Sequence, residues 1–187
     1  MRIKFGTKPG LGCRDQASGL FHLAHFRSAL ERELARLDHG DRPLSLALVD
    51  LPRAQPADWA AFGRLARAAL RPIDLAARLS ERRTGFLFPE SSAARTRRWR
   101  ADFLADLGRD DRLGGLDFKC GLALAQPWEG LAAGELLAQA AQNISDDGSD
   151  AEAPCGLFDP DPATAIATDE RGLLFDGFKA LEGGRRP

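Results

Sequence analysis

Apolar residues recur along the chain with two different periods, one typical of amphipathic helices and one typical of buried strands. Between residues 21 and 37 they return every three or four positions, which predicts a helix. Residues 44–51 are almost all apolar, and such a short run favours a strand that is buried on both faces. A single carboxylate, Asp50, stands near the carboxyl end of this run, so one acidic group is expected at the end of a buried strand.

The same alternation continues to about residue 144 and predicts the remaining elements. Helices are expected at about 56–70, 91–107 and 131–144, and strands at 73–79, 84–88 and 116–125. From residue 44 the order is therefore β, α, β, β, α, β, which is the split βαβ arrangement. We expect an α+β domain in which a central antiparallel sheet carries two helices on one face, with one helix added before it and one after it.

Composition divides the chain into three segments. A short lead at 1–13 precedes the periodic domain at 14–150, and residues 151–187 form a tail rich in Pro, Gly and acids. The charge is also uneven, because residues 1–115 hold 21 basic and 14 acidic groups whereas the remainder holds 5 basic and 13 acidic. The tail is expected either to dock on a protein partner or to fold back on the domain as a final strand or turn. In either case the contact would be made by one apolar patch of the tail, which consists of Leu173, Leu174, Phe175 and Phe178.

Composition also argues against several classes of function. In 187 residues with 26 basic and 27 acidic groups there is no apolar run of about 18 residues, and residues 1–6 lack the core of a secretory signal. This predicts a cytoplasmic protein without a membrane partner. Three cysteines without CxxC spacing indicate neither a disulfide framework nor a zinc site. The densest basic cluster, Arg95–Arg100, lies in a helical pattern and is expected to be a solvated helix face, so no nucleic-acid partner is predicted.

Several stretches, taken in their order along the chain, resemble the GGDEF domain of bacterial diguanylate cyclases. They are residues 15–20, Phe26, the strand at 44–51, residues 71–79, residues 86–89 and residues 121–123. The resemblance spans about residues 14–148 and implies the palm architecture shared with class III nucleotidyl cyclases and polymerases. This agrees with the βαββαβ order of the hydrophobic pattern. In that family two GTP molecules are condensed to cyclic di-GMP with the help of two divalent ions that carboxylates hold.

The resemblance also implies that catalysis is lost. Asp50 falls on the family's first metal carboxylate, but Pro52 stands where a second acidic residue is usual. The stretch after Asp50 is shorter than usual by about ten residues, roughly three helical turns, and lacks the polar loop that holds guanine in the family. Both acidic positions of the family signature are arginines here, and they would repel a metal ion. The five signature positions fall on Ser80, Glu81, Arg82, Arg83 and Thr84.

One binding motif of the family is retained. Arg71 and Asp74 form an RxxD motif, and five residues separate it from Ser80, which is the spacing of the inhibitory site where cyclic di-GMP binds. A guanidinium can hold a phosphate or a guanine edge through two hydrogen bonds, and a carboxylate can accept from the guanine N1 and N2 groups. Arg78 could supply a further phosphate contact. The alternative is that Arg71 and Asp74 pair with each other across the turn between helix and strand.

The sequence therefore favours a catalytically inactive signalling module that acts by binding. It would serve either as a cyclic di-GMP receptor at Arg71, Asp74 and Arg78 or as a protein-interaction scaffold without a nucleotide ligand. An active diguanylate cyclase with unusual ligands is a third, more distant alternative. No cofactor and no metal ion are expected. Because only about 13 residues precede the domain, its signal would come from a protein partner or through a homodimer, and the sequence leaves both open.

Overall fold

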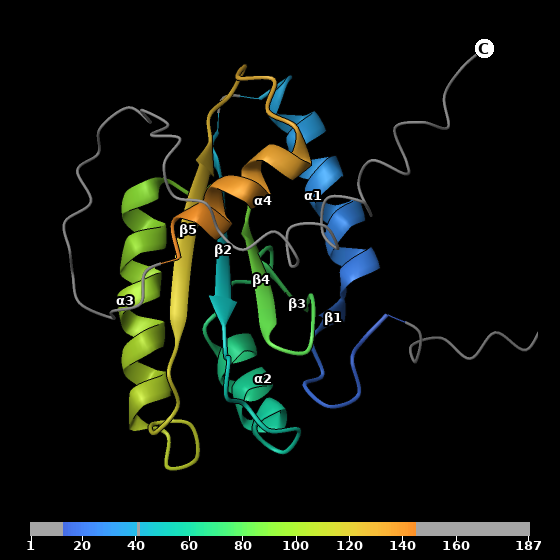
Figure 1. Ribbon diagram of the computed structural model, residues 1–187. Coiled ribbons are helices and arrows are strands. Elements are labelled where there is room, and N and C mark those ends of the chain that lie inside the picture. The colour runs from blue at the N-terminus through green and yellow to red at the C-terminus, as the bar shows by residue number, and fades with distance from the viewer. Residues whose placement is uncertain (1–12, 41, 145–187) are drawn as a thin grey trace, which may run out of the picture. The chain divides into compact units, whose positions relative to one another are not determined.

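The structure, a computed structural model, describes residues 13–40 and 42–144 (Figure 1). The expected lead, apart from Cys13, and the expected tail lie outside the described residues. So does the apolar patch predicted as a docking segment, which consists of Leu173, Leu174, Phe175 and Phe178. Within the described ranges no helix is long and apolar enough to cross a membrane.

Apart from one additional short strand, the described chain contains the strands and helices that the hydrophobic pattern predicts. In chain order they are β1 (Phe21–His22), α1 (Leu23–Leu37), β2 (Leu44–Asp50), α2 (Asp58–Ala68), β3 (Leu75–Arg78), β4 (Arg83–Phe88), α3 (Ala93–Arg109), β5 (Lys119–Ala125) and α4 (Ala133–Gln142). From β2 onward this is the predicted βαββαβ order, so the α+β prediction is confirmed.

In the described part of the chain a single mixed sheet holds the strands in the order β1-β3-β4-β2-β5 (Figure 1). Strand β2 pairs antiparallel with β4 on one side and with β5 on the other, and β3 is antiparallel to β4. These four strands form the antiparallel sheet expected from the sequence. The remaining strand, β1, pairs in parallel with β3 and makes the sheet mixed.

Strand β1 is the element that the pattern did not predict. We expected a helix from residue 21, but α1 begins only after His22, because Phe21 and His22 are extended and pair with β3. The backbone groups of these two residues gain partners at the edge of the sheet, and periodicity read over a window of many residues cannot detect so short a pairing. The ring of Phe21 also stacks on that of His25, with the ring centroids 4.1 Å apart, so the strand is packed against the first turn of α1.

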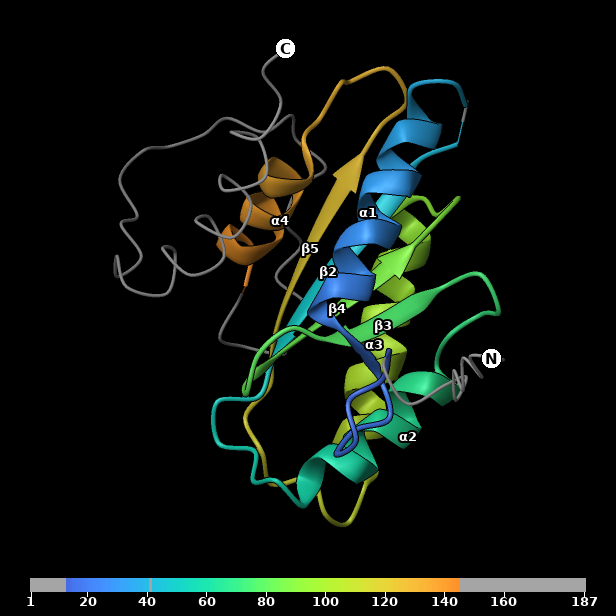
Figure 2. The same ribbon diagram turned by 90° about the vertical axis from the view of Figure 1, so that its right-hand side faces the viewer.

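The helices cover both faces of the sheet (Figure 2). On one face lie α2 and α3, whose side chains Phe62 and Phe103 pack edge to face with centroids 5.8 Å apart. On the other face α1 lies beside α4, and a glycine lets α4 approach the sheet closely. A Cβ at Gly121 of β5 would lie 2.0 Å from the carbonyl oxygen of Ala140. The two helices expected on one face are therefore α2 and α3, and the two added helices cover the opposite face.

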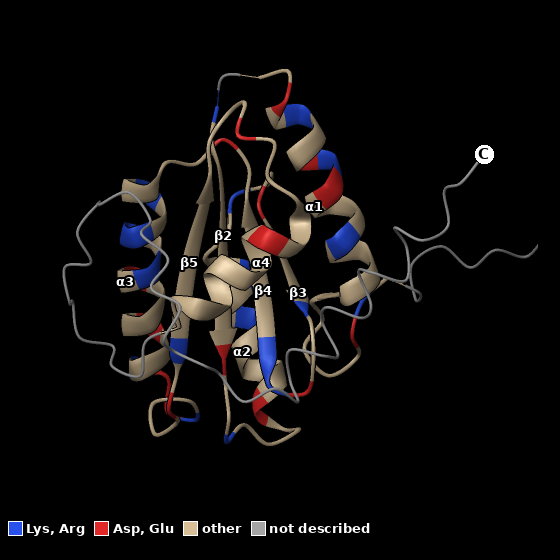
Figure 3. Cartoon of the chain, turned by 45° about the horizontal axis from the view of Figure 1, so that its top comes forward, with Lys and Arg blue, Asp and Glu red and all other residues tan. Residues whose placement is uncertain are grey.

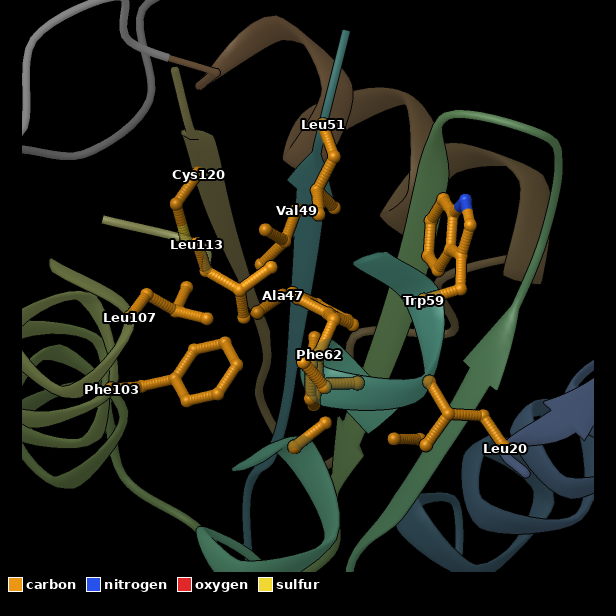
Figure 4. Close-up of a cluster of buried hydrophobic side chains, with 14 of the residues drawn as sticks. Leu20, Ala47, Val49, Leu51, Trp59, Phe62, Phe103, Leu107, Leu113 and Cys120 are labelled. Atoms are coloured by element: carbon orange, nitrogen blue, oxygen red, sulfur yellow. The ribbon is translucent and has the colours of Figure 1, made fainter. Parts of the chain in front are cut away.

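Strand β2 is the centre of the buried core (Figure 4). Residues 44–49 are each at most 2% exposed, and their side chains alternate between the two faces. On the face of α2 and α3 they meet large apolar side chains from both helices, namely Trp59, Phe62, Phe103 and Leu107. Asp50, the last residue of the strand, is only partly buried, because its side chain is 19% exposed. The strand thus ends in one partly exposed carboxylate beside the buried core.

Candidate functional site

The carboxyl end of β2 carries the acidic group that the sequence singled out. The antiparallel register places Asp50 opposite Arg83 of β4 on one side and opposite Lys119 of β5 on the other. Figure 3 shows the acidic end of β2 between the basic starts of these two strands. Opposite charges on neighbouring strands stabilise a sheet. This end of the sheet therefore holds one carboxylate flanked by two basic residues.

Arg83 binds Asp50 through two parallel hydrogen bonds. Nε of Arg83 donates to Oδ1 and Nη2 donates to Oδ2, each at 2.6 Å. Both side chains are 19% exposed, so the pair is largely removed from water. A fork of this kind is among the strong hydrogen-bonded pairs of proteins. It engages both oxygens of the carboxylate that the resemblance assigns to a metal ion.

The residues at this end of the sheet do not fit a divalent cation. Mg²⁺ requires several oxygen ligands in a near-octahedral arrangement, whereas both oxygens of Asp50 are bonded to a guanidinium. Among the described residues no group of three or more His, Cys, Asp or Glu side chains could hold a metal ion. Of the other signature positions, Glu81 is exposed at the hairpin tip and Thr84 is fully buried in β4. A positive side chain thus stands beside Asp50 where a metal ion would need to bind.

The hairpin between β3 and β4, on which the signature positions fall, is closed by its own backbone. The N–H groups of Leu79 and Ser80 both donate to the carbonyl of Arg83, at 2.9 and 3.2 Å. The carbonyl of Arg82 accepts from the N–H of Leu51 at 2.7 Å, which ties the hairpin to the residue after β2. The backbone groups of the turn are therefore hydrogen-bonded within the hairpin and to the residue that follows β2.

Arg78, which the sequence offered as a phosphate ligand, lies at the carboxyl end of β3 and contacts other groups. Its Cζ lies 4.2 Å from the ring centroid of the buried Trp59, and its Nη1 lies 3.3 Å from both carboxylate oxygens of Asp15. Burial works against ionisation, but hydrogen bonds from Ser18 and the charge of Arg78 hold the pKa of the Asp15 carboxyl below its ordinary value. This network joins the segment before β1 to β3.

Arg71 and Asp74 pair with each other across the turn from α2 to β3, which is one of the two alternatives that the sequence left open. Nη2 of Arg71 donates to Oδ1 of Asp74 at 2.8 Å, and the Arg71 backbone N–H donates to Oδ2 at 2.9 Å. Nη2 also donates to the Pro89 carbonyl at 2.9 Å and to the Ser91 hydroxyl at 2.7 Å. The side chain of Asp74 is 2% exposed and that of Arg71 is 29% exposed, so solvent reaches the guanidinium far more than the carboxylate.

Arg71 lines a hollow of about 320 Å³ between the end of α2, the turn into β3 and the segment before α1. This volume is at the lower end of the range for small-molecule sites. Arg67 of α2 and Arg14 of the segment before β1 line the same hollow, so three guanidinium groups and the Asp74 carboxylate border it. Apolar walls complete it, and they are formed by Leu20, Phe21, Leu70, Pro72, Leu75 and Ala76.

Sequence reasoning found Arg71 and Asp74 of this hollow but missed Arg14 and Arg67. A signal existed for Arg67, which stands four residues before Arg71 near the end of a predicted helix. Arg14 has no such signal, because it reaches the hollow only through the folding of its segment against α2. Arg78, in contrast, was expected here and is not among the residues that line the hollow.

Solved structures with the same fold are GGDEF domains. The GGDEF domain of FimX from Pseudomonas aeruginosa matches with a TM-score of 0.62 at 14% identity, over 71% of this chain and 91% of that chain. The GGDEF domain of DgcB from Caulobacter crescentus, in complex with cyclic di-GMP, gives 0.63 at 17% identity, over 76% and 90% of the two chains. The diguanylate cyclase SiaD from Pseudomonas aeruginosa, in complex with its activator SiaC, gives 0.64 at 16% identity, over 71% and 56%.

No protein-family model matches this sequence, and no curated protein matches it either. At these levels of identity the likeness to solved structures shows the fold alone. It confirms the GGDEF-like domain and the palm-like α+β fold expected from the resemblance.

Proposed function

We propose that this chain is a catalytically inactive GGDEF-like signalling module that acts by binding, with cyclic di-GMP as the ligand of the hollow beside Arg71 and Asp74. The fold supports the proposal, and one similar structure, that of DgcB, is a complex with cyclic di-GMP. The observation that carries it is the hollow itself, where the guanidinium of the RxxD motif is joined by two further arginines. Guanidinium groups are well suited to phosphate recognition because their donors match two phosphate oxygens at once.

The loss of catalysis is supported by the pair of Asp50 and Arg83. A two-metal reaction needs carboxylate oxygens to hold the ions that stabilise the attacking and leaving oxygens. Here both carboxylate oxygens of Asp50 accept hydrogen bonds of 2.6 Å from Arg83. The module would therefore keep the scaffold of a cyclase and a place for the product without performing the reaction.

Calorimetric titration of the full chain with cyclic di-GMP tests the receptor role. The proteins compared are wild type, Arg71→Gln and a matched control, Arg64→Gln, which removes an exposed charge from α2 outside the hollow. We expect wild type and the control to bind alike and Arg71→Gln to lose at least about tenfold in affinity, because a charge-assisted contact is lost. Circular dichroism establishes that the variant is folded. Absence of binding by wild type would refute the receptor role.

Inactivity is tested separately with GTP and Mg²⁺ or Mn²⁺ at high protein concentration. We expect no cyclic di-GMP to form, because the carboxylate chemistry that two ions need is missing at the end of β2. Chromatography of the nucleotides after long incubation measures this. Formation of cyclic di-GMP in proportion to the amount of protein would show that the domain is a cyclase and would overturn this half of the proposal.

A second candidate, a protein-interaction scaffold without a nucleotide ligand, is favoured by one exposed aromatic side chain. Trp128, in the loop between β5 and α4, is 72% exposed and has a φ of 68°. Exposed tryptophans are frequent anchors of protein interfaces, and SiaD was solved with its activator. Under this alternative Trp128→Ala weakens capture of a protein partner whereas Arg71→Gln leaves it unchanged. Weaker capture by Arg71→Gln together with unchanged capture by Trp128→Ala would argue against this alternative.

A further inference from the structure

Two arginines of the hollow, Arg14 and Arg67, are anchored to neighbouring carbonyl groups of one turn. Nη1 of Arg67 donates to the carbonyl of Ser18, and Nη1 of Arg14 donates to that of Gly19, each at 2.8 Å. Arg14 also lies over the ring of Phe21, with its Cζ 4.1 Å from the ring centroid. Both guanidinium groups are thus held in place before a ligand arrives, which lowers the entropic cost of binding one.

The turn that carries these carbonyl groups is itself fixed. The carboxylate of Asp15 accepts hydrogen bonds from the N–H and the hydroxyl of Ser18, at 2.8 and 2.6 Å. Helix α2 packs directly on the turn, because a Cβ at Gly63 would lie 1.9 Å from the Ser18 carbonyl oxygen. Gly19 has a φ of +68°, and a Cβ there would lie 2.6 Å from Nη1 of Arg67. The backbone of the turn therefore determines where the two guanidinium groups stand.

The charges around the hollow are unbalanced. Within residues 13–40 and 42–144 no carboxylate forms an ion pair with Arg14 or Arg67, whereas Arg71 is paired with Asp74. Three guanidinium groups and one carboxylate leave the hollow with a net charge of about +2. Like charges that border one hollow repel each other, and an anion bound between them offsets this repulsion.

We propose that Arg14 and Arg67 are phosphate-binding residues and that the hollow recognises its ligand mainly through phosphate groups. This inference rests on the proposed function, because it takes the same hollow as the binding site. A cyclic dinucleotide carries two phosphodiester charges, which match the net charge of the hollow. The Nη2 groups of Arg14 and Arg67 have no protein acceptor in the part of the chain that the structure describes, so each can donate to a phosphate oxygen.

The carboxylate of Asp74 is poorly placed to read a guanine edge. Its oxygens accept hydrogen bonds from the backbone N–H, Nε and Nη2 of Arg71, and its side chain is 2% exposed. A base that contacted this carboxylate would have to displace those donors, which would leave a nearly buried charge without its partner. We therefore expect little discrimination between guanine and adenine in a cyclic dinucleotide.

The test is calorimetric titration of the full chain in the presence of EDTA with three probes: cyclic di-GMP, cyclic di-AMP and inorganic pyrophosphate. The variants are Arg14→Gln and Arg67→Gln, with Arg64→Gln as the matched control on the same helix as Arg67. Glutamine removes the charge and keeps an N–H donor, and circular dichroism verifies that each variant is folded.

We expect the two dinucleotides to bind within about tenfold of each other. The affinity for each should fall about tenfold in either hollow variant and stay unchanged in Arg64→Gln, because one charge-assisted phosphate contact is lost. The affinity of either hollow variant should also depend less on salt concentration than that of wild type, because salt screens the contact between the exposed charges that the variant has lost.

The possible results separate this inference from the proposed function. If wild type binds cyclic di-GMP and both hollow variants bind it like Arg64→Gln, the inference is overturned and the receptor role stands. A preference for cyclic di-GMP over cyclic di-AMP of more than about tenfold also overturns recognition mainly through phosphates. If pyrophosphate binds in a way that depends on Arg14 and Arg67 but cyclic di-GMP does not bind, the inference stands and the proposed ligand is wrong. If wild type binds none of the probes, both are overturned.

Discussion

The pair of Asp50 and Arg83 should contribute measurably to the stability of the domain, and the contribution can be worked from its geometry. Two hydrogen bonds of 2.6 Å join the side chains, each of which is 19% exposed. At an effective dielectric constant of about 20, unit charges about 4 Å apart attract each other by about 4 kcal/mol. Partial removal from water offsets some of this. We expect a net coupling of about 2 kcal/mol, above the value of up to about 1 kcal/mol typical of exposed pairs.

A double-mutant cycle measures this coupling. Asp50→Asn, Arg83→Gln and the double variant are unfolded in urea with tryptophan fluorescence as the signal, and about 2 kcal/mol corresponds to roughly 1 M in the urea midpoint. The matched control is the pair of Asp106 and Arg109 on α3, which is joined at 3.1 Å but is 54% and 76% exposed. It should couple by less than about 0.5 kcal/mol. Equal couplings for the two pairs would refute the reasoning, because burial is the stated cause of the difference.

Other contacts lead to predictions of the same kind. Gly121→Ala would bring a Cβ within 2.0 Å of the Ala140 carbonyl oxygen, so the free energy of unfolding measured in urea should fall by about 1–3 kcal/mol. The control is Gly134→Ala, whose Cβ would meet nothing within 4 Å and which should be neutral or slightly stabilising. The pKa of Asp15 is lower in the folded chain than its ordinary value of 3.8, so its carboxylate stabilises the fold above about pH 4 and this contribution is lost as the pH falls through the folded pKa. The stability difference between wild type and Asp15→Asn should therefore shrink between about pH 6 and pH 3, and a constant difference would contradict this. Arg83→Glu would place two carboxylates opposite each other, and we expect Mg²⁺ to stabilise this variant but not wild type. At a Mg²⁺ concentration of ten times its Kd the stabilisation should be about 1.4 kcal/mol, measured as a higher melting temperature. Equal responses of the two proteins would argue against a metal-excluding role of Arg83.

The parts of the fold that carry their own periodicity could be predicted from the sequence. Strand β2 is an example, because burial on both faces requires the nearly continuous apolar run of residues 44–49. Strand β1 could not be predicted in this way. Its two residues, Phe21 and His22, are extended because the edge of β3 offers them backbone partners, and this depends on a contact between segments far apart in the chain.

In the candidate site too, contacts between residues close in sequence could be predicted and long-range contacts could not. Arg71 and Asp74 lie three residues apart, so a local motif was enough to find them and to foresee that they could pair. The partner of Asp50 lies 33 residues away and is chosen by the register between β2 and β4. Arg67 is anchored to a carbonyl 49 residues earlier in the chain, and Arg14 approaches it only in the folded molecule. Hydrophobic periodicity carries no information on such long-range placements of polar side chains.

The guanidinium of Arg83 differs from a metal ion in that it cannot dissociate. It is attached to the strand next to Asp50, so its effective concentration at the carboxylate is far above that of a free ion and does not vary. A chelator, or competition among nucleotides for Mg²⁺, would leave the charge at this end of the sheet unchanged. The charge balance at this end of the sheet would then be independent of the supply of metal ions around the domain.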